Sequence, residues 1–503
     1  MGRQLARKST LSFINHIIMA IFSFISLVFV KRYMGYEAVG MIAFAVSLMT
    51  MFSIIGDMGF GVAHLKRVGE GLDIGRCNGT IITIKTLLTI VMGGVIFLYL
   101  FIQKHIFNYE FESNELKIVV YIIIINSLIQ NIAMAFNNIF SARLEIAKGQ
   151  IPRLVRRSIV MILKISFALV GFSVIYLAYA ELIGVIVYLL LCILLFLGYP
   201  LKKPNKEFIK KYATFAIPVV FLGAVGKLAE TVDKVMLGYF LGSYEVGIYS
   251  VPQRITQTLL LISTVITNIL FVAFSSYYSK KNFSEIQRLS NNAEKYISTL
   301  VLPFVIILVV FAEPILLIFG DDTGPSVPIL QIMAVAIYLM AIMNPYSVQV
   351  VSTGHIKIGF KLALLSLGLN LLLNSIFIPE NIGGISLLGL GAKGAAIATM
   401  ISFAIQGILA RIVAYRITKT RPNNRILLHF IAAALTFTPI YLLYSTLHFE
   451  WIYLFGYFLL TFALFLLIMG LFREFTKKDF ELYLNAVHPG KMKKYIVGEL
   501  RNK

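Results

Sequence analysis

Charged residues are scarce in this sequence. Asp, Glu, Lys and Arg make up 14% of its 503 residues, whereas a soluble domain typically carries about 25%. Hydrophobic residues make up 58%, and the mean hydropathy is +0.84. Apolar runs of about 20 residues recur along the whole length, each long enough to cross a bilayer. Because backbone polar groups in lipid must pair within a helix, these runs exclude a water-soluble enzyme and predict an all-α polytopic membrane protein.

Acidic residues and cysteines are also few. The 24 Asp and Glu residues face 45 Lys and Arg residues, which leaves a net charge of +21. Nucleic-acid binding is one interpretation of such an excess. Lys and Arg also gather at the cytoplasmic ends of membrane spans, and we therefore expect no nucleic-acid partner. Cys77 and Cys192 form no CxxC pair and are expected to be buried small hydrophobic residues.

Motifs of soluble catalysis are missing. The sequence contains no HExxH, no GxxxxGK[ST] and no D-x-D of the kind that holds a metal–nucleotide sugar. Residues 389–394 formally match GxGxxG, but no strand is expected before them, so close helix packing by small residues is the better interpretation. We predict no enzymatic activity, no cofactor and no metal site.

The apolar runs predict about fourteen transmembrane helices. They lie near residues 11–30, 38–62, 79–102, 118–140, 158–177, 179–199, 213–241, 246–274, 297–319, 326–351, 358–378, 387–410, 427–446 and 451–471. A basic tail follows at 473–503.

Basic residues alternate between the loops and predict the orientation. The 103–117 loop is acidic, with Glu110 and Glu112, whereas the 142–157 and 200–211 loops are rich in Lys and Arg. Because basic loops stay in the cytoplasm, we expect a multi-pass protein of the cell membrane with both termini cytoplasmic.

A short turn occurs twice. Residues 35–40 read GYEAVG and follow the first span, and residues 242–247 read GSYEVG and follow the seventh. Six spans separate the copies, so two six-helix bundles should share one orientation and relate by a pseudo-two-fold axis along the membrane normal. We assign residues 1–200 and 201–420 to these bundles, 421–472 to two additional helices and 473–503 to a cytoplasmic tail.

Charges inside the predicted spans are the candidate substrate-binding residues. They are Lys227, Glu230, Asp233 and Lys234 in the seventh span and Arg254 in the eighth. The first four fall within an arc of about 120° on one helix face. Each deep charge costs at least about 2.5 kcal/mol and must face protein or water. Glu230 could pair with Lys227 or Lys234, or the face could line a cavity that binds an anion. Arg254 has no acid one turn away, which favours the second interpretation.

Five further polar residues are secondary candidates. Asp57, Lys85 and Lys164 each lie about two turns inside a span, where the two lysines could also extend to the interface. Asn370 and Asn374, one turn apart, could line the cavity or bond a neighbouring helix, and we favour the bond.

Several segments together resemble the polysaccharide-export branch of the multidrug/oligosaccharidyl-lipid/polysaccharide exporter superfamily. They are 233–250 (DKVMLGYFLGSYEVGIYS), 57–61 (DMGFG), 352–357 (STGHIK) and 391–399 (GAKGAAIAT). The resemblance covers nearly the full length. It implies alternating-access transport of a polyprenyl-(pyro)phosphate-linked oligosaccharide to the outer leaflet, for cell-surface glycan biosynthesis. It also implies contact with membrane lipids, a coupling ion such as H⁺ or Na⁺, and glycan-assembly enzymes as candidate partners.

Three alternatives remain at this point. A cation-coupled multidrug antiporter of the same superfamily is expected to use deep acidic groups, but the first span has Asn15 and His16 and no carboxylate. A peptidoglycan-precursor flippase shares the fourteen-span layout. A membrane glycosyltransferase or ligase usually needs a large outer loop or an acidic metal site, and neither is evident in the sequence.

Overall fold

The structure is a computed structural model that describes residues 2–446 and 453–475. Almost all of the described chain is helical, apart from the short antiparallel pair β1 (Asn381–Ile382) and β2 (Ile385–Ser386). Two compact units meet in sequence between Gly247 and Ile248. Most of the predicted tail, 476–503, and the first residues of the last predicted span lie outside the described residues.

The first unit is built from seven helices and the start of an eighth. They are α1 (Gly2–Asp57), α2 (Phe60–Gly69), α3 (Ile74–His105), α4 (Asn114–Ala142), α5 (Ile146–Val170), α6 (Val174–Phe196), α7 (Lys206–Phe240) and α8 (Ser243–Gln257), which continues into the second unit. Helix α1 packs on α5, α7 and α4, and α4 packs on α6. Helix α7 belongs to this unit by its contacts. The division into bundles 1–200 and 201–420 therefore stays a prediction about the sequence repeat.

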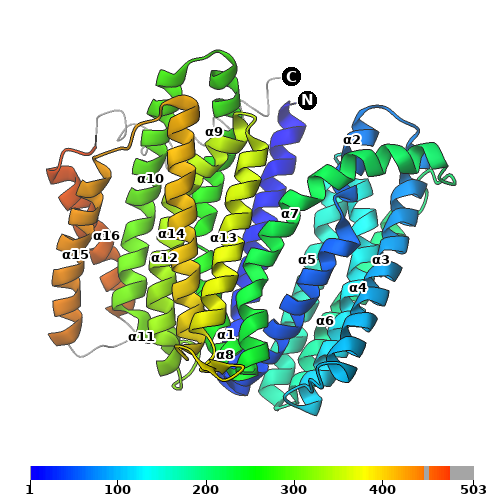
Figure 1. Cartoon of the computed structure of the whole chain (residues 1–503), viewed down its shortest axis with the longest axis horizontal. Coiled ribbons are helices and arrows are strands. Elements are labelled where there is room, and N and C mark those ends of the chain that lie inside the picture. The colour runs from blue at the N-terminus through cyan, green and yellow to red at the C-terminus, as the bar shows by residue number, and fades with distance from the viewer. Residues whose placement is uncertain (1, 447–452, 476–503) are drawn as a thin grey trace. The chain divides into compact units, whose positions relative to one another are not determined.

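The second unit contains the remaining helices. They are α9 (Leu260–Ser279), α10 (Phe283–Val310), α11 (Ala312–Leu317), the 3₁₀ turn η1 (Gly324–Ser326), α12 (Val327–Ser352), α13 (Ile356–Phe377), α14 (Gly391–Thr418), α15 (Ile426–Thr446) and α16 (Leu454–Leu471). Helix α12 packs on α14, α10 and α9. Helices α15 and α16 lie side by side and pack on α10 (Figure 1).

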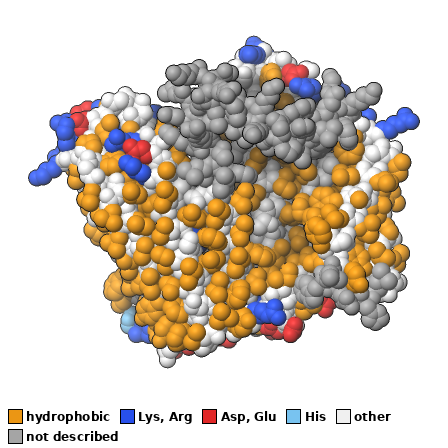
Figure 2. All heavy atoms as spheres, turned by 180° about the vertical axis from the view of Figure 1, so that it is seen from behind, with side chains coloured by type: hydrophobic (Ala, Val, Ile, Leu, Met, Phe, Trp, Pro, Cys, Tyr) orange, Lys and Arg blue, Asp and Glu red, His pale blue; other side chains and the backbone are white. Residues whose placement is uncertain are grey.

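The predicted polytopic membrane architecture is confirmed. Eleven stretches of the described chain are long and apolar enough to cross a bilayer, and about fourteen spans is consistent with them. One of these stretches, Ile17–Gly69, holds two predicted spans, because Gly35 (φ 79°) breaks the helical backbone inside α1. In Figure 2, hydrophobic side chains cover the sides of the helices and charged side chains gather near the upper and lower ends.

Element boundaries differ from the prediction in several places, and helix α5, for example, begins at Ile146 and not at residue 158. The span predicted at 246–274 is two helices, α8 and α9, separated at residues 258–259. The Thr258 hydroxyl donates to the Ile255 carbonyl at 2.6 Å, a bond that competes with regular helix pairing. Helix α10 begins at Phe283, well before the predicted start at residue 297, because Asn282 accepts a hydrogen bond from the Glu285 N–H and starts the helix outside the apolar run.

The two copies of the repeated turn pack against each other in the first unit. Gly35 and Gly242 both have positive φ, 79° and 92°, which glycine adopts without strain. A Cβ on Gly40 would lie 1.7 Å from the Ser243 carbonyl oxygen, and a Cβ on Gly247 would lie 2.0 Å from that of Tyr36. The final glycine of each copy therefore allows the backbone of the other copy to approach closely.

Candidate functional site

The centre of the first unit holds a fully buried lysine, Lys85 of α3. Its ammonium donates to Asp57 Oδ1 at 2.6 Å, the Gly56 carbonyl at 3.1 Å and Asn131 Oδ1 at 3.4 Å. An ammonium has three N–H donors, so all of them have acceptors. Its side chain is 0% exposed. Lys85 therefore does not extend to the interface, and its donors are already occupied by α1 and α4.

Asp57 and Lys227 lie at the accessible side of this cluster. The Asp57 side chain is 35% exposed although one of its oxygens binds Lys85. One turn earlier on α1, Ser53 Oγ lies 3.5 Å from Lys227 Nζ of α7, a long contact, and Lys227 is half-buried. In the described chain this is the single hydrogen bond of the Lys227 ammonium. The arrangement offers an ammonium for an anion beside a carboxylate for a cation or proton.

The other candidates on α7 have mixed environments. Glu230 is exposed, and within the part of the chain that the structure describes it makes no ion pair with Lys227 or Lys234. Asp233 is 2% exposed and Lys234 is half-buried. Arg254 is an exposed residue of α8 in the second unit. The structure therefore brings Asp57, Lys85 and Lys227 together in one unit, whereas Arg254 belongs to the other.

The linker between α6 and α7 holds the N-terminal end of α7 on the first unit. Asn78 donates to the Pro200 carbonyl at 2.9 Å, and Lys202 Nζ donates to Asp73 Oδ2 at 2.7 Å. The Lys202 hydrogen bond lowers the pKa of Asp73 below its usual value. Asp73 also accepts from the Arg76 N–H at the start of α3. The start of α7, and with it the register of Lys227, is thus tied to α3.

Lys164 lies in a second charged cluster of the first unit. Its ammonium donates to Glu181 Oε1 of α6 at 2.8 Å, and Arg156 of α5 donates to Glu181 Oε2 at 3.4 Å. All three side chains are largely buried, with exposed fractions of 14%, 12% and 11% in the order Lys164, Arg156, Glu181. Lys164 therefore does not extend to the interface either, and Arg156 and Glu181 are residues that the sequence analysis missed.

Asn370 and Asn374 connect two helices of the second unit. Asn374 donates to Asn370 Oδ1 at 3.1 Å, and Asn370 donates to Thr399 Oγ1 of α14 at 3.2 Å. Both side chains are buried. These contacts are the inter-helix bonding favoured from the sequence.

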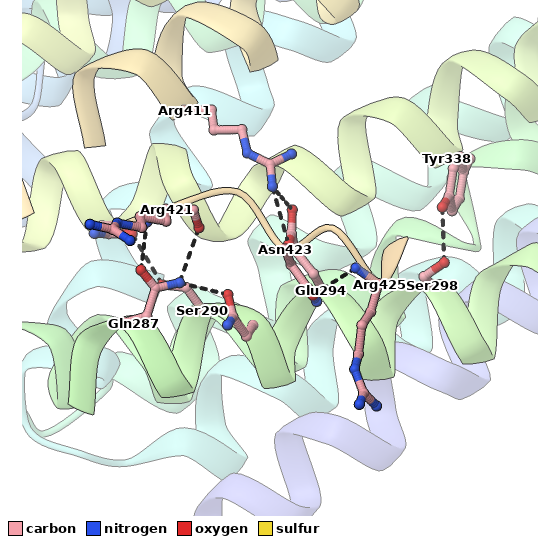
Figure 3. Close-up of polar contacts among 11 residues, drawn as sticks. Gln287, Ser290, Glu294, Ser298, Tyr338, Arg411, Arg421, Asn423 and Arg425 are labelled. Carbon is pink, nitrogen blue, oxygen red and sulfur yellow. Dashed lines mark hydrogen bonds and ion pairs between the residues drawn. The ribbon is translucent and has the colours of Figure 1, made fainter. Parts of the chain in front are cut away.

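A buried ion pair in the second unit was not predicted. Glu294 of α10 is 0% exposed, and its Oε1 lies 3.1 Å from a guanidinium nitrogen of Arg411 of α14. Figure 3 shows both side chains within a row of polar residues along α10 that also includes Gln287, Ser290 and Ser298. Ser298 lies 2.9 Å from the Tyr338 hydroxyl of α12, and Gln287 donates to the Arg421 carbonyl at 3.0 Å. These bonds join α10, α12 and α14 within the unit.

Removing either member of the Asp57–Lys85 pair should lower the stability of the protein by a different amount. Asp57→Asn leaves the fully buried Lys85 ammonium without a counter-charge, and breaking a buried pair costs about 3–5 kcal/mol. Lys85→Met leaves a carboxylate that already reaches water. We therefore expect Asp57→Asn to lower the thermal unfolding temperature of the purified protein more than Lys85→Met does. Equal losses, or the reverse order, would show that the pair is not asymmetric.

Two solved structures share the fold of this chain. A lipid II flippase, MurJ, in an inward closed conformation superposes with a TM-score of 0.74 at 17% identity, covering 92% of this chain and 99% of the flippase. An inward-facing multidrug resistance MATE family transporter superposes with a TM-score of 0.62 at 14% identity, covering 80% of this chain and 96% of the transporter. At these identities the likeness shows the fold alone, which this chain shares with both proteins.

The sequence then places the chain in its family. The model of the family described as polysaccharide biosynthesis protein matches residues 5–278, more than half of the chain, and the MatE model matches 218–376. The chain therefore belongs to the polysaccharide biosynthesis protein family, which confirms the resemblance found in the motifs.

Curated relatives agree with this assignment. The probable low-salt glycan biosynthesis flippase Agl15 of Haloferax volcanii is 25% identical over 410 residues, which is 80% of this chain and 82% of that protein. The teichuronic acid biosynthesis protein TuaB of Bacillus subtilis is 23% identical over 329 residues, which is 62% of this chain and 64% of that protein.

Proposed function

We propose that this protein moves an oligosaccharide linked to polyprenyl phosphate or pyrophosphate from the cytoplasmic to the outer leaflet. The observation that carries the proposal is the match over 80% of the chain to a relative named as a glycan biosynthesis flippase. The geometry of Lys227 supports it, since a half-buried ammonium with one 3.5 Å contact can donate hydrogen bonds to a phosphate oxygen. The protein is then a transporter, without enzymatic activity.

Within this proposal Lys227, Lys234 and Arg254 bind the carrier phosphate during transport. A deep base is stable only beside an anion, a counter-carboxylate or water. In the described chain the Lys227 ammonium contacts the Ser53 hydroxyl and forms no ion pair with Glu230. Two six-helix bundles, 1–200 and 201–420, would open the bound phosphate alternately to the two sides of the membrane, while the lipid tail stays in the bilayer. Asp57 is the candidate residue for binding a coupling H⁺ or Na⁺.

The multidrug antiporter alternative is less well supported. The basic side chains of this chain outnumber its acids, and the buried Glu181 already pairs with both Lys164 and Arg156. A cationic drug would therefore meet few uncompensated carboxylates in the first unit.

The cellular test of the function is removal of the protein from a cell that makes the glycan. We expect lipid-linked oligosaccharide to accumulate with its glycan on the cytoplasmic side, and re-expression to restore surface glycan. Unchanged surface glycan in a cell without any other flippase of this family would contradict the proposal.

We also propose that both termini are cytoplasmic and that the 103–117 loop is outside. Glu110 and Lys203 are exposed, and the native Cys77 and Cys192 are buried. An impermeant thiol reagent added to intact cells should therefore label Glu110→Cys and spare Lys203→Cys, while both are labelled in permeabilised cells. Labelling of position 203 alone in intact cells would show that the orientation is the opposite of the one proposed.

A further inference from the structure

The Arg156–Lys164–Glu181 cluster of the first unit carries more positive charge than its acid neutralises. Two bases converge on one carboxylate. Helix α5 contains five basic residues and no acid along its whole length, Ile146–Val170. Two bases and one acid leave a charge of +1 in a largely buried place.

The cluster lies well inside α5 and α6, away from the short loop that joins them. Lys164 is six residues before the end of α5 at Val170, which is about 9 Å along the helix, and Arg156 is about 21 Å from that end. Glu181 is seven residues after the start of α6 at Val174, about 10 Å. Because these side chains are largely buried, a charge without a partner there must face protein, water or a ligand.

Most hydrogen-bond donors of the cluster are unused. A guanidinium and an ammonium together have eight N–H donors, and in the described part of the chain Arg156 and Lys164 each make one hydrogen bond, both to Glu181. The Arg156 Nε is buried and has no acceptor. Lys85, by contrast, uses all three of its donors. In the described part of this unit, the donors of Lys85 are therefore saturated, whereas those of Arg156 and Lys164 are not.

Close packing rules out rearrangement of α5 against α6 as the source of acceptors. A Cβ on Gly184, one turn beyond Glu181, would lie 2.4 Å from Val160 and 3.3 Å from the Arg156 side chain. The helices are already as close as glycine allows, and Arg156 and Lys164 keep small exposed fractions of 12% and 14%. An acceptor must come from outside the two helices.

We propose that Arg156 and Lys164 form a second anion site that binds a phosphate-type oxyanion. The site lies on α5 and α6 and does not depend on Lys227 or Arg254. A phosphate offers several acceptor oxygens and a negative charge, which match a fork of donors and the excess charge. The phosphate could be that of a polyprenyl lipid or a soluble anion.

The sign of the response to Glu181→Gln tests the site. Removing the acid raises the cluster charge to +2, so anion affinity should rise about tenfold or more. Arg156→Gln and Lys164→Gln each leave one neutral base–acid pair, so these variants should fold and lose anion binding. Arg288→Gln, which alters an exposed pair with Glu285 in the other unit, is the matched control and should bind as the wild type does.

The measurement is the ligand-induced rise in thermal unfolding temperature of the full-length protein in nanodiscs, which follows affinity. Inorganic pyrophosphate and a C55 polyprenyl phosphate are compared at constant ionic strength. Stronger stabilisation of Glu181→Gln by either ligand supports the site, and a response to the lipid alone identifies the lipid as the source. Equal ligand-induced shifts of the unfolding temperature in all four variants would overturn the proposal. Arg156, Lys164 and Glu181 would then form only a structural ion pair, and the proposed role in glycan export would not be affected.

Discussion

Replacing Lys227 or Arg254 with alanine is expected to abolish glycan export while the protein remains inserted and folded. Each base lies inside a predicted span, and the proposed function assigns both bases to the phosphate of the carrier lipid. Loss of an interaction that binds the transported anion should reduce export at least a hundredfold, since a charged hydrogen bond left unmade costs several kcal/mol. Surface glycan, normalised to the amount of protein in the membrane, is the measurement.

Two control variants make this result specific. Lys210→Ala removes an exposed base from the N-terminal end of the same helix, α7, and should leave export unchanged. Arg254→Lys keeps the charge and loses the bidentate geometry, so partial export is expected. If both alanine variants, present at normal levels, export glycan at the wild-type rate, neither base binds the carrier phosphate.

Gly40→Ala and Gly247→Ala should each lower stability and export sharply. Both glycines lie in helices, where alanine would normally be favoured by up to about 1 kcal/mol. Here the new methyl group would meet the backbone of the other turn at 1.7 Å and 2.0 Å, and backbone cannot rotate away as a side chain can. The turns must separate, at a cost of about 1–3 kcal/mol or more.

Gly94→Ala in α3 is the matched control. Gly94 is also helical, and a Cβ there would meet nothing within 4 Å. The unfolding temperature of the Gly94→Ala variant should stay level or rise, whereas those of Gly40→Ala and Gly247→Ala should fall. A fall of equal size in all three variants would mean that the packed turns have no special role.

Much of the fold follows from the sequence because hydrophobic length is a direct signal in a membrane protein. The helix break at Gly35 and the repeated turn were visible as short polar interruptions between apolar runs. That the two turns pack on each other was not visible, since the contact joins residues 40 and 243, far apart in sequence. Short local patterns identify turns, but they do not say which turns meet.

The charged residues illustrate a second limit. Asp57, Lys85 and Lys227 stood out because charge within an apolar run is rare. Which of them is saturated depends on partners such as Asn131, 46 residues from Lys85. Glu294 and Arg411 escaped notice because they lie just outside the predicted spans 297–319 and 387–410, whereas α10 and α14 extend beyond the apolar runs. Extending each span by one turn would have revealed both.

Transport by the purified protein in proteoliposomes tests the central claim most directly. Vesicles would carry a polyprenyl-pyrophosphate-linked oligosaccharide, and an impermeant glycosidase outside would report how much glycan is exposed. We predict that wild-type protein makes nearly all of the glycan accessible over time, whereas protein-free vesicles and Lys227→Ala vesicles leave about half of it protected. If wild-type vesicles protect as much glycan as protein-free ones, this protein does not flip lipid-linked oligosaccharide.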